Sequence, residues 1–173
     1  MFKVKVTGLD EVIKKIENLK NSLDSKQHEL LERLSAIGID VASVKFKNAQ
    51  YDGINDASVD PSPEWVDEKT LVITARGQAV AFIEFGTGVH YTEQHPTADD
   101  VGATRGSYGK GNGSKDSWAY YGNPGTNGHI VRTLEDGTTV VRTHGNPPAR
   151  AMYDASQAMR EKIVEIAKEI YKR

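Results

Sequence analysis

Two long stretches of apolar residues at helical spacing constrain the fold of this chain more than any other feature. Residues 24–48 carry apolar side chains three and four positions apart, with charged residues between them. The same spacing recurs from about Arg150 to Ile170. Each pattern is typical of an amphipathic helix, whose apolar face has to be buried against another element. The two stripes are Leu30, Leu31, Leu34, Ile37, Val41 and Val44, and Met152, Ala155, Met159, Ile163, Ile166 and Ile170.

A shorter stripe near the N-terminus predicts a further helix. Apolar residues at 12–19 have helical spacing, and residues 7–10 have the spacing of a capping box. We expect this helix to end near residues 21–22, before the 24–48 helix begins. Gly38 lies inside the second helix at a cost of about 1 kcal/mol relative to alanine. Its position predicts that another element approaches the helix closely there.

Two segments between the helices are predicted to form hairpins. Residues 64–66 and 70–75 alternate like strands on either side of a short polar turn. Residues 129–131 and 138–142 flank Asp136-Gly137, a dipeptide typical of a two-residue hairpin turn.

The most apolar segment of the central region is Ala79–Phe85, which predicts a core strand of an antiparallel sheet. Residues 57–59 predict a further strand that ends at Pro61 and Pro63. Helices precede this sheet and one helix follows it. The order predicts an α+β fold as a single domain over residues 1–173. We expect a small antiparallel sheet packed against two N-terminal helices and one C-terminal helix.

Residues 86–127 are rich in Gly, Ser, Asn and Tyr and poor in aliphatic residues. With the following hairpin they form a long loop and hairpin insertion over residues 86–146, and loops of this length are commonly functional. The aromatic side chains in it offer large contact areas at low entropic cost. Two interpretations stay open: the loop grips another protein, or it packs against its own domain. These aromatic residues are Tyr108, Trp118, Tyr120 and Tyr121.

Charge is distributed unevenly along the chain. Residues 51–100 contain ten acidic and two basic residues, a net of −8, whereas the whole chain has a net charge of −2. No basic stripe typical of nucleic-acid-binding proteins is present, so we expect no direct nucleic-acid readout. The acidic segment fits either a solvated face or a head-to-tail contact between copies.

The chain contains no cysteine, which excludes disulfides, thiolate zinc sites and thiol nucleophiles. No run approaches the roughly 18 apolar residues of a membrane helix, and the first residues lack the apolar region of a secretory signal. We therefore expect a protein that is used without leaving the cytosol and that has no membrane partner.

Nucleotide binding and acid–base catalysis have little support in the sequence. Gly106 to Gly111 has the glycine spacing of a phosphate-binding loop, but the lysine that a triphosphate requires is missing. Glu84 would act as a general base only if neighbouring aromatic rings desolvated it. A lone glutamate at the end of a strand is more often a surface or hydrogen-bonded residue.

His90, Glu93 and His95 are competent ligands for zinc or iron. They define an alternative function, a small metal-dependent hydrolase, although their spacing is not that of a helical metal motif. His129 and His144 would join them only if the hairpin folded back. A stand-alone protein-binding module is a further alternative.

Three segments occur in an order that is informative when they are taken together. They read VTGLD at residues 6–10, AFIEFGTG at residues 81–88 and PPARAM at residues 147–152. In this order they resemble the tailed-phage head–tail joining family, the small neck, tail-completion or minor tail proteins of long-tailed phages and prophages. The chain departs from the family pattern at Asp52-Gly53, where a Thr is missing, and after Pro148, where no Phe follows.

The resemblance implies a non-enzymatic virion protein without a cofactor, made in the host bacterial cytoplasm. It is implied to assemble with itself as a ring of six copies at the head-proximal end of the tail. Neighbouring tail and connector proteins would be its other partners. Gly86 and Gly88 are expected to adopt positive φ and to let a neighbouring subunit's backbone approach. The contact candidates are Glu84, Phe85, Gly86, Thr87, Gly88, Tyr108, Trp118, Tyr120, Tyr121, Pro147, Pro148 and Arg150.

Overall fold

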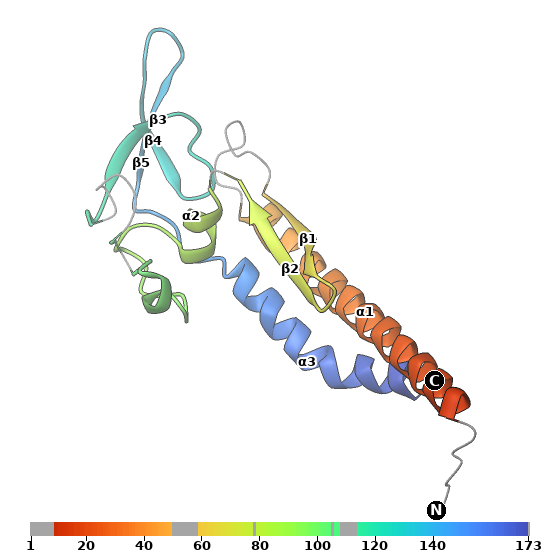
Figure 1. The fold of residues 1–173 in the computed structure, drawn as a ribbon. Helices are drawn as coiled ribbons and strands as arrows, with labels where there is room; N and C mark the ends of the chain where they lie inside the picture. Colours follow the sequence, from red (N-terminus) through yellow and green to blue (C-terminus); the bar gives the residue numbers. More distant parts are fainter. Residues whose placement is uncertain (1–8, 50–58, 78, 105, 108–113, 173) are drawn as a thin grey trace, which may run out of the picture.

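The structure is a computed structural model, and it describes residues 9–49, 59–77, 79–104, 106–107 and 114–172. It has the predicted α+β fold, with helices at both ends of the chain and two small antiparallel sheets between them (Figure 1). The elements in chain order are α1 (Leu9–Asn48), β1 (Asp60–Asp67), β2 (Thr70–Arg76), α2 (Val80–Phe85), the short 3-10 helix η1 (Asp99–Val101), β3 (Trp118–Tyr121), β4 (Gly128–Thr133), β5 (Thr139–Thr143) and α3 (Ala151–Tyr171). Several residues of the sequence analysis fall outside the described residues: the capping residues Thr7 and Gly8, the Asp52-Gly53 segment, most of the strand predicted at 57–59, and Tyr108.

Helix α1 is one continuous helix of 40 residues, so the predicted break near residues 21–22 is wrong. Two polar residues of moderate helix propensity do not end a helix when neither glycine nor proline accompanies them. Acidic residues occupy the first turn and basic residues the last, in favourable positions relative to the helix dipole. The N-terminal half of the chain therefore contributes one long helix where two were expected.

Helix α3 runs antiparallel beside the C-terminal part of α1, and the core lies between them (Figure 1). Ala42 and Phe46 of α1 pack with Ile83 of α2 and with the first turns of α3. A second cluster joins Leu34 of α1 to the end of α3. The Lys45 ammonium adds an ion pair with Asp154 at the start of α3. The members of the second cluster are Leu34, Ile166 and Ile170.

Gly38 of α1 lies where two other elements approach, as predicted. A Cβ atom at this position would lie 2.7 Å from Cδ1 of Ile73 on β2 and 2.8 Å from Sδ of Met159 on α3. These distances are below normal van der Waals contact, so the glycine allows all three elements to meet.

The predicted hairpin is present as β1 and β2, which pair antiparallel from Asp60 opposite Arg76 onward. It lies along α1, where the ring of His28 stacks on Trp65 with centroids 4.5 Å apart. The prediction that a strand ends at Pro61 and Pro63 is wrong, because both prolines lie inside β1. Each strand of a two-stranded sheet has one unpaired edge, and proline is tolerated on such strands.

Residues 80–85 form the helix α2, so the prediction of a core strand at Ala79–Phe85 is wrong. A short apolar run does not distinguish a buried strand from a buried helical turn. Alanine at 79 and 81 favours the helix. Ile83 is nevertheless in the core, as the apolar composition required.

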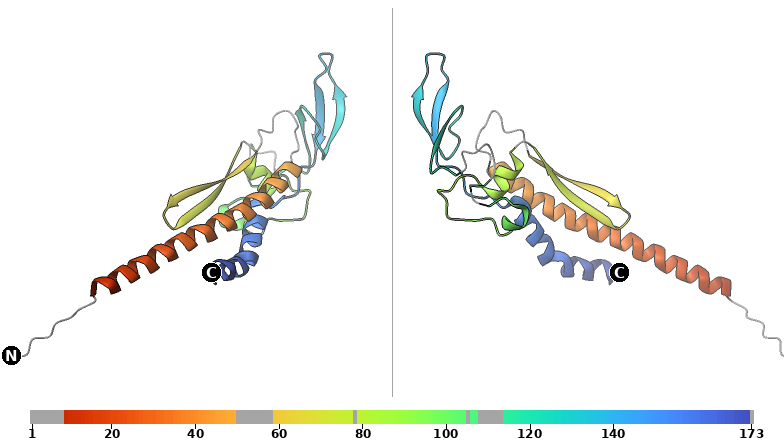
Figure 2. Two further views of the ribbon diagram at one scale, coloured as in Figure 1. Left: turned by 90° about the vertical axis from the view of Figure 1, so that its right-hand side faces the viewer. Right: turned by 60° about the vertical axis from the view of Figure 1, so that its left-hand side comes forward.

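The insertion forms a three-stranded antiparallel sheet in the order β3-β5-β4, which stands away from the helices (Figures 1 and 2). Strand β3 arises from residues that the sequence placed in a loop. The predicted hairpin is confirmed as β4 and β5. Its turn has three residues rather than two, because Leu134 N–H donates to the carbonyl of Thr138 at 2.8 Å. Gly137 takes the positive φ that a three-residue turn of this type requires.

Candidate functional site

The start and the end of the insertion meet at one place, which we call the junction (residues 84–88 and 144–150). Thr87 and Asn146 form an antiparallel bridge there. Thr87 N–H donates to the carbonyl of Asn146 at 2.8 Å, and Asn146 N–H donates back to the carbonyl of Thr87 at 3.1 Å. The Thr87 hydroxyl oxygen accepts from the same Asn146 N–H at 2.9 Å. The insertion therefore leaves and rejoins the helical body at one place, where its two ends are hydrogen-bonded to each other.

Glycines allow the two backbones of the junction to touch. Gly86 has φ of 78° and Gly88 has φ of 81°, which confirms the predicted positive values. A Cβ at Gly86 would lie 2.7 Å from the carbonyl oxygen of Asn146. A Cβ at Gly145 would lie 2.1 Å from the carbonyl oxygen of Thr87. The backbone that approaches these glycines belongs to the same chain and not, as predicted, to a neighbouring subunit.

Glu84 is buried and caps helix α3 from the other side of the junction. Its carboxylate accepts N–H of Met152 at 2.8 Å and N–H of Tyr153 at 2.9 Å. These are among the first amides of α3, which have no partner within the helix. Arg150 at the N-cap has φ of 54° and supplies no side-chain cap, so Glu84 provides what the local sequence lacks. Of the two alternatives for Glu84, the hydrogen-bonded residue is the one observed.

His95 is also buried, and its two ring nitrogens have separate partners. Thr97 N–H donates to Nδ1 at 3.1 Å, which makes Nδ1 an acceptor. Nε2 then carries the proton and donates to the Glu84 carboxylate at 2.9 Å. The rings of Phe85 and Tyr153 lie edge-on to the imidazole. His95 thus supports the glutamate that caps α3, and Phe85 belongs to the same packing.

An open groove of about 700 Å³ lies beside this pair, between β2, α2 and α3. Its lining is mostly apolar and includes Ile73, Val80 and Met152, with Glu84 and His95 at one side. The Glu84 carboxylate accepts two hydrogen bonds from α3 and one from His95, so its oxygens are already occupied by partners within the chain.

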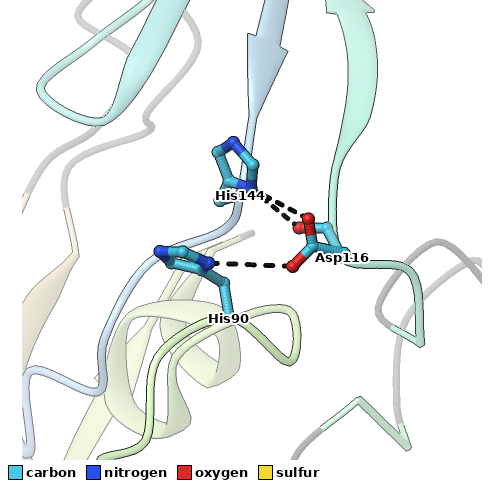
Figure 3. A group of neighbouring side chains, drawn as sticks. All are labelled: His90, Asp116 and His144. Atoms are coloured by element: carbon cyan, nitrogen blue, oxygen red, sulfur yellow. Dashed lines mark hydrogen bonds and ion pairs between the residues drawn. The ribbon is translucent and has the colours of Figure 1, made fainter.

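Two further histidines and an aspartate lie together beside the junction (Figure 3). His90 follows the glycine turn, Asp116 precedes β3 and His144 follows β5. Nδ1 of His90 lies 3.7 Å from Oδ1 of Asp116, and Nδ1 of His144 lies 3.5 Å from Oδ2 of the same carboxylate. The two imidazole centroids are 4.7 Å apart. Within the described residues, these three are the group of His, Asp and Glu side chains whose ligand atoms could meet at one metal ion.

The predicted ligand set of His90, Glu93 and His95 is therefore not brought together, since His95 faces Glu84 and His90 faces Asp116. His144 lies beside His90, which agrees with the expectation that it would join the ligands if the hairpin folded back. Asp116 had no signal in the sequence, because it is a single acid in a polar loop. Only the folded junction places it between the two histidines.

The remaining contact candidates divide into packed and exposed residues. The ring of Trp118 covers Gly88 and Gly145, and the Tyr120 hydroxyl donates to the carbonyl of Asn123 at 2.8 Å. Tyr121 is exposed on the insertion. The aromatic loop therefore packs largely on its own domain, with Tyr121 left at the surface. Pro147 and Pro148 run along Gly86 within the junction.

The N-terminal half of α1 carries an exposed apolar stripe, which we call the α1 stripe. This part of the helix extends beyond the hairpin and beyond α3 (Figure 2). The exposed fractions of its side chains range from 46% to 62%. The stripe was predicted as a helix face, but its exposure is visible only in the structure. It consists of Leu9, Val12, Ile13, Ile16, Leu19 and Leu23.

Comparison with known protein families, with curated proteins and with solved structures gave no match. Among the described helices, none combines the length and the apolar character needed to cross a bilayer.

Proposed function

We propose that this chain is a structural protein of the tailed-phage neck, which completes the tail or joins it to the head connector as a ring of copies. The α1 stripe is the observation that carries the proposal. The resemblance of the N-terminal segment, of residues 81–88 and of residues 147–152 to head–tail joining proteins gives the setting.

The α1 stripe would contribute a large share of the free energy that association requires. Fully burying an apolar side chain of this size contributes about 1.5–3 kcal/mol, so burying the exposed half of six contributes on the order of 5–9 kcal/mol. Association costs about 4–15 kcal/mol in lost freedom, which the stripe offsets in part before any other contact forms. Contiguous exposed apolar surface of this kind marks a protein interaction site.

The spacing of the α1 stripe favours another helix as its partner. Leu9, Ile16 and Leu23 are seven residues apart, and so are Val12 and Leu19. These are the a and d positions of a heptad repeat. Ile13 widens the stripe beyond the two-residue seam of a helix pair, which suits a bundle of more than two helices. Parallel α1 arms packed around one axis would give cyclic symmetry, as a ring requires.

The insertion supplies a second surface at the opposite end of the elongated molecule (Figure 1). Tyr121, Ile130 and Val131 are exposed there. Strand β4 is an edge of its sheet, and an edge strand offers unpaired backbone groups to another chain. In this proposal the α1 arms hold copies together, and the insertion contacts the neighbouring tail or connector protein.

Gold-labelled antibody on phage particles from a lysate of the source tests the neck assignment directly. We expect label at the head–tail junction. Particles that remain unlabelled, when the epitope is accessible in the free protein, would contradict the assignment.

A matched pair of variants tests the role of the α1 stripe by native mass spectrometry, alone and with purified tails. The double variant Ile16→Asp and Leu19→Asp should lose association. The control Asn18→Asp and Asn21→Asp adds the same charge on the roughly opposite face of the helix, at 100° per residue, and should associate like the wild type. Equal association of both variants would exclude the stripe as the contact.

A further inference from the structure

Three side chains from distant parts of the chain meet beside the junction. His90 lies at the start of the insertion, in the segment that follows α2, whereas Asp116 precedes β3 and His144 follows β5. We propose that His90, Asp116 and His144 form a binding site for a divalent transition metal, with zinc the best match. This inference does not depend on a role in the phage neck.

The separations of the ligand atoms fit a small tetrahedral ion. Zinc bonds of about 2.0–2.1 Å place tetrahedral ligand atoms roughly 3.3 Å apart. Nδ1 of His90 lies 3.7 Å from Oδ1 of Asp116 and Nδ1 of His144 lies 3.5 Å from Oδ2, so each imidazole is within a few tenths of an ångström of that separation from one carboxylate oxygen. One ligand atom of each residue lies within 4.8 Å of the other two. The His90 and His144 side chains are 50% and 37% exposed, so their rings can adjust without disturbing the core.

The donor set selects the class of metal. Two imidazoles and one carboxylate suit zinc and its neighbours in the first transition row, whereas calcium and magnesium prefer oxygen ligands alone. Three protein ligands leave at least one position for water or for a group from another molecule. The site would then be open on its solvent side.

Two of the three ligands, His144 and Asp116, lie next to backbone that other contacts hold in place. His144 directly precedes Gly145, which touches the backbone of Thr87. Asp116 precedes Ser117, whose hydroxyl accepts two hydrogen bonds from the Arg142 guanidinium on β5 at 3.2 and 3.0 Å. Fixed ligand backbones reduce the entropy that metal binding would otherwise cost.

Binding at His144 changes one hydrogen bond. Nδ1 of His144 lies 3.0 Å from the carbonyl oxygen of Asp116 and donates to it when this nitrogen carries the proton. A metal at Nδ1 replaces that hydrogen bond, and the proton moves to Nε2 through exchange with solvent. The ring stays neutral, as a metal ligand requires. The metal would tie the segment after α2 to the sheet of the insertion and fix the orientation of the insertion on the body.

Zinc titration of the full chain tests the site. The protein is purified without a metal-binding tag, stripped with a chelator, dialysed and titrated with zinc chloride in a calorimeter. We expect one zinc per chain. His90→Ala, His144→Ala and Asp116→Asn should each weaken binding by tenfold or more. His129→Ala is the matched control, because His129 is an exposed histidine of the same insertion and lies outside the cluster.

Cobalt gives a second readout that does not depend on affinity alone. Cobalt bound by two imidazoles and a carboxylate in a four-coordinate site absorbs strongly in the visible range. We expect this absorption in the wild type and in His129→Ala, and its loss in the double variant His90→Ala and His144→Ala. Absence of stoichiometric zinc, equal weakening by His129→Ala, or cobalt absorption that survives the double variant would overturn the proposal.

Discussion

Replacing Glu84 with glutamine tests whether this residue holds helix α3 in place. The carboxylate accepts three hydrogen bonds in a buried position, from Met152 N–H, Tyr153 N–H and His95 Nε2–H. Tyr153 and His95 share Oε1, whereas Met152 uses Oε2. In Glu84→Gln, the amide oxygen can take the place of Oε1. The amide NH₂ then faces the Met152 N–H, and two donors meet.

The expected loss follows from these contacts. Leaving a buried N–H without an acceptor costs about 1–3 kcal/mol. Loss of the negative charge at the helix N-terminus adds about 0.3–1 kcal/mol. Glu84→Gln should therefore lower the free energy of unfolding by roughly 1–4 kcal/mol, compared with the about 5–15 kcal/mol typical of a domain.

Urea unfolding followed by circular dichroism measures this loss, and amide hydrogen exchange locates it. Exchange at Met152 and Tyr153 should accelerate more than exchange in the middle of α3. Glu93→Gln is the matched control, since Glu93 is exposed in the same segment and should change stability by less than about 0.5 kcal/mol. If Glu84→Gln matched this control, or if protection at Met152 and Tyr153 were unchanged, the capping argument would be refuted.

Three further substitutions test other parts of the fold. Gly86→Ala should destabilise the protein by about 2 kcal/mol or more in urea, because the Cβ meets the Asn146 carbonyl at positive φ; stability within about 0.5 kcal/mol of wild type would contradict the close approach. Gly38→Ala should destabilise it too, since overpacking against Ile73 costs about 1–3 kcal/mol and outweighs the about 1 kcal/mol gained in helix propensity; a net gain would show that the three elements separate easily. The Thr138 backbone N–H holds the pKa of the Asp136 carboxyl below its ordinary value of 3.8. The stability that this hydrogen bond contributes is therefore present above pH 3.8 and is lost as the pH falls through the lowered pKa. Carbon-detected NMR titration should find this lowered pKa in the wild type and an ordinary one in Thr138→Pro, which lacks the N–H.

The elements that the sequence predicted well are those with long periodic patterns. The 24–48 stripe and the stripe after Arg150 became α1 and α3, and the turn residues at Asp136-Gly137 located the β4–β5 hairpin. The strand predicted at Ala79–Phe85 is a helix, because a short apolar run indicates burial but is too short to show the period of a strand or of a helix. Only part of the run is buried: Ile83 packs in the core as part of helix α2, whereas Phe82 is exposed.

The candidate site could not be predicted, because its contacts join residues far apart in the chain. Glu84 and Met152 are separated by 68 positions, and a cap that acts across such a distance leaves no local pattern. Asp116 has no feature that distinguishes it from other loop acids. His90 and His144 were recognised as possible ligands, but their pairing depends on the closure of the insertion at Thr87 and Asn146.

The junction changes what the resemblance to head–tail joining proteins means for individual residues. The EFGTG and PPAR segments contain predicted partner contacts, but in the structure the two segments bind each other. Ala149 N–H donates to Ile83 O at 2.9 Å, and Arg150 N–H donates to Glu84 O at 3.2 Å. Two sequence segments that form one structural unit have to be retained together to preserve the fold, whether or not a partner touches either. Their joint occurrence is therefore evidence for a shared junction, and the search for partner contacts moves to surfaces that the fold leaves exposed. These are the α1 stripe at one end of the molecule and, at the other, the sheet of the insertion, where Tyr121 on β3 and Ile130 on β4 are exposed on its two edge strands.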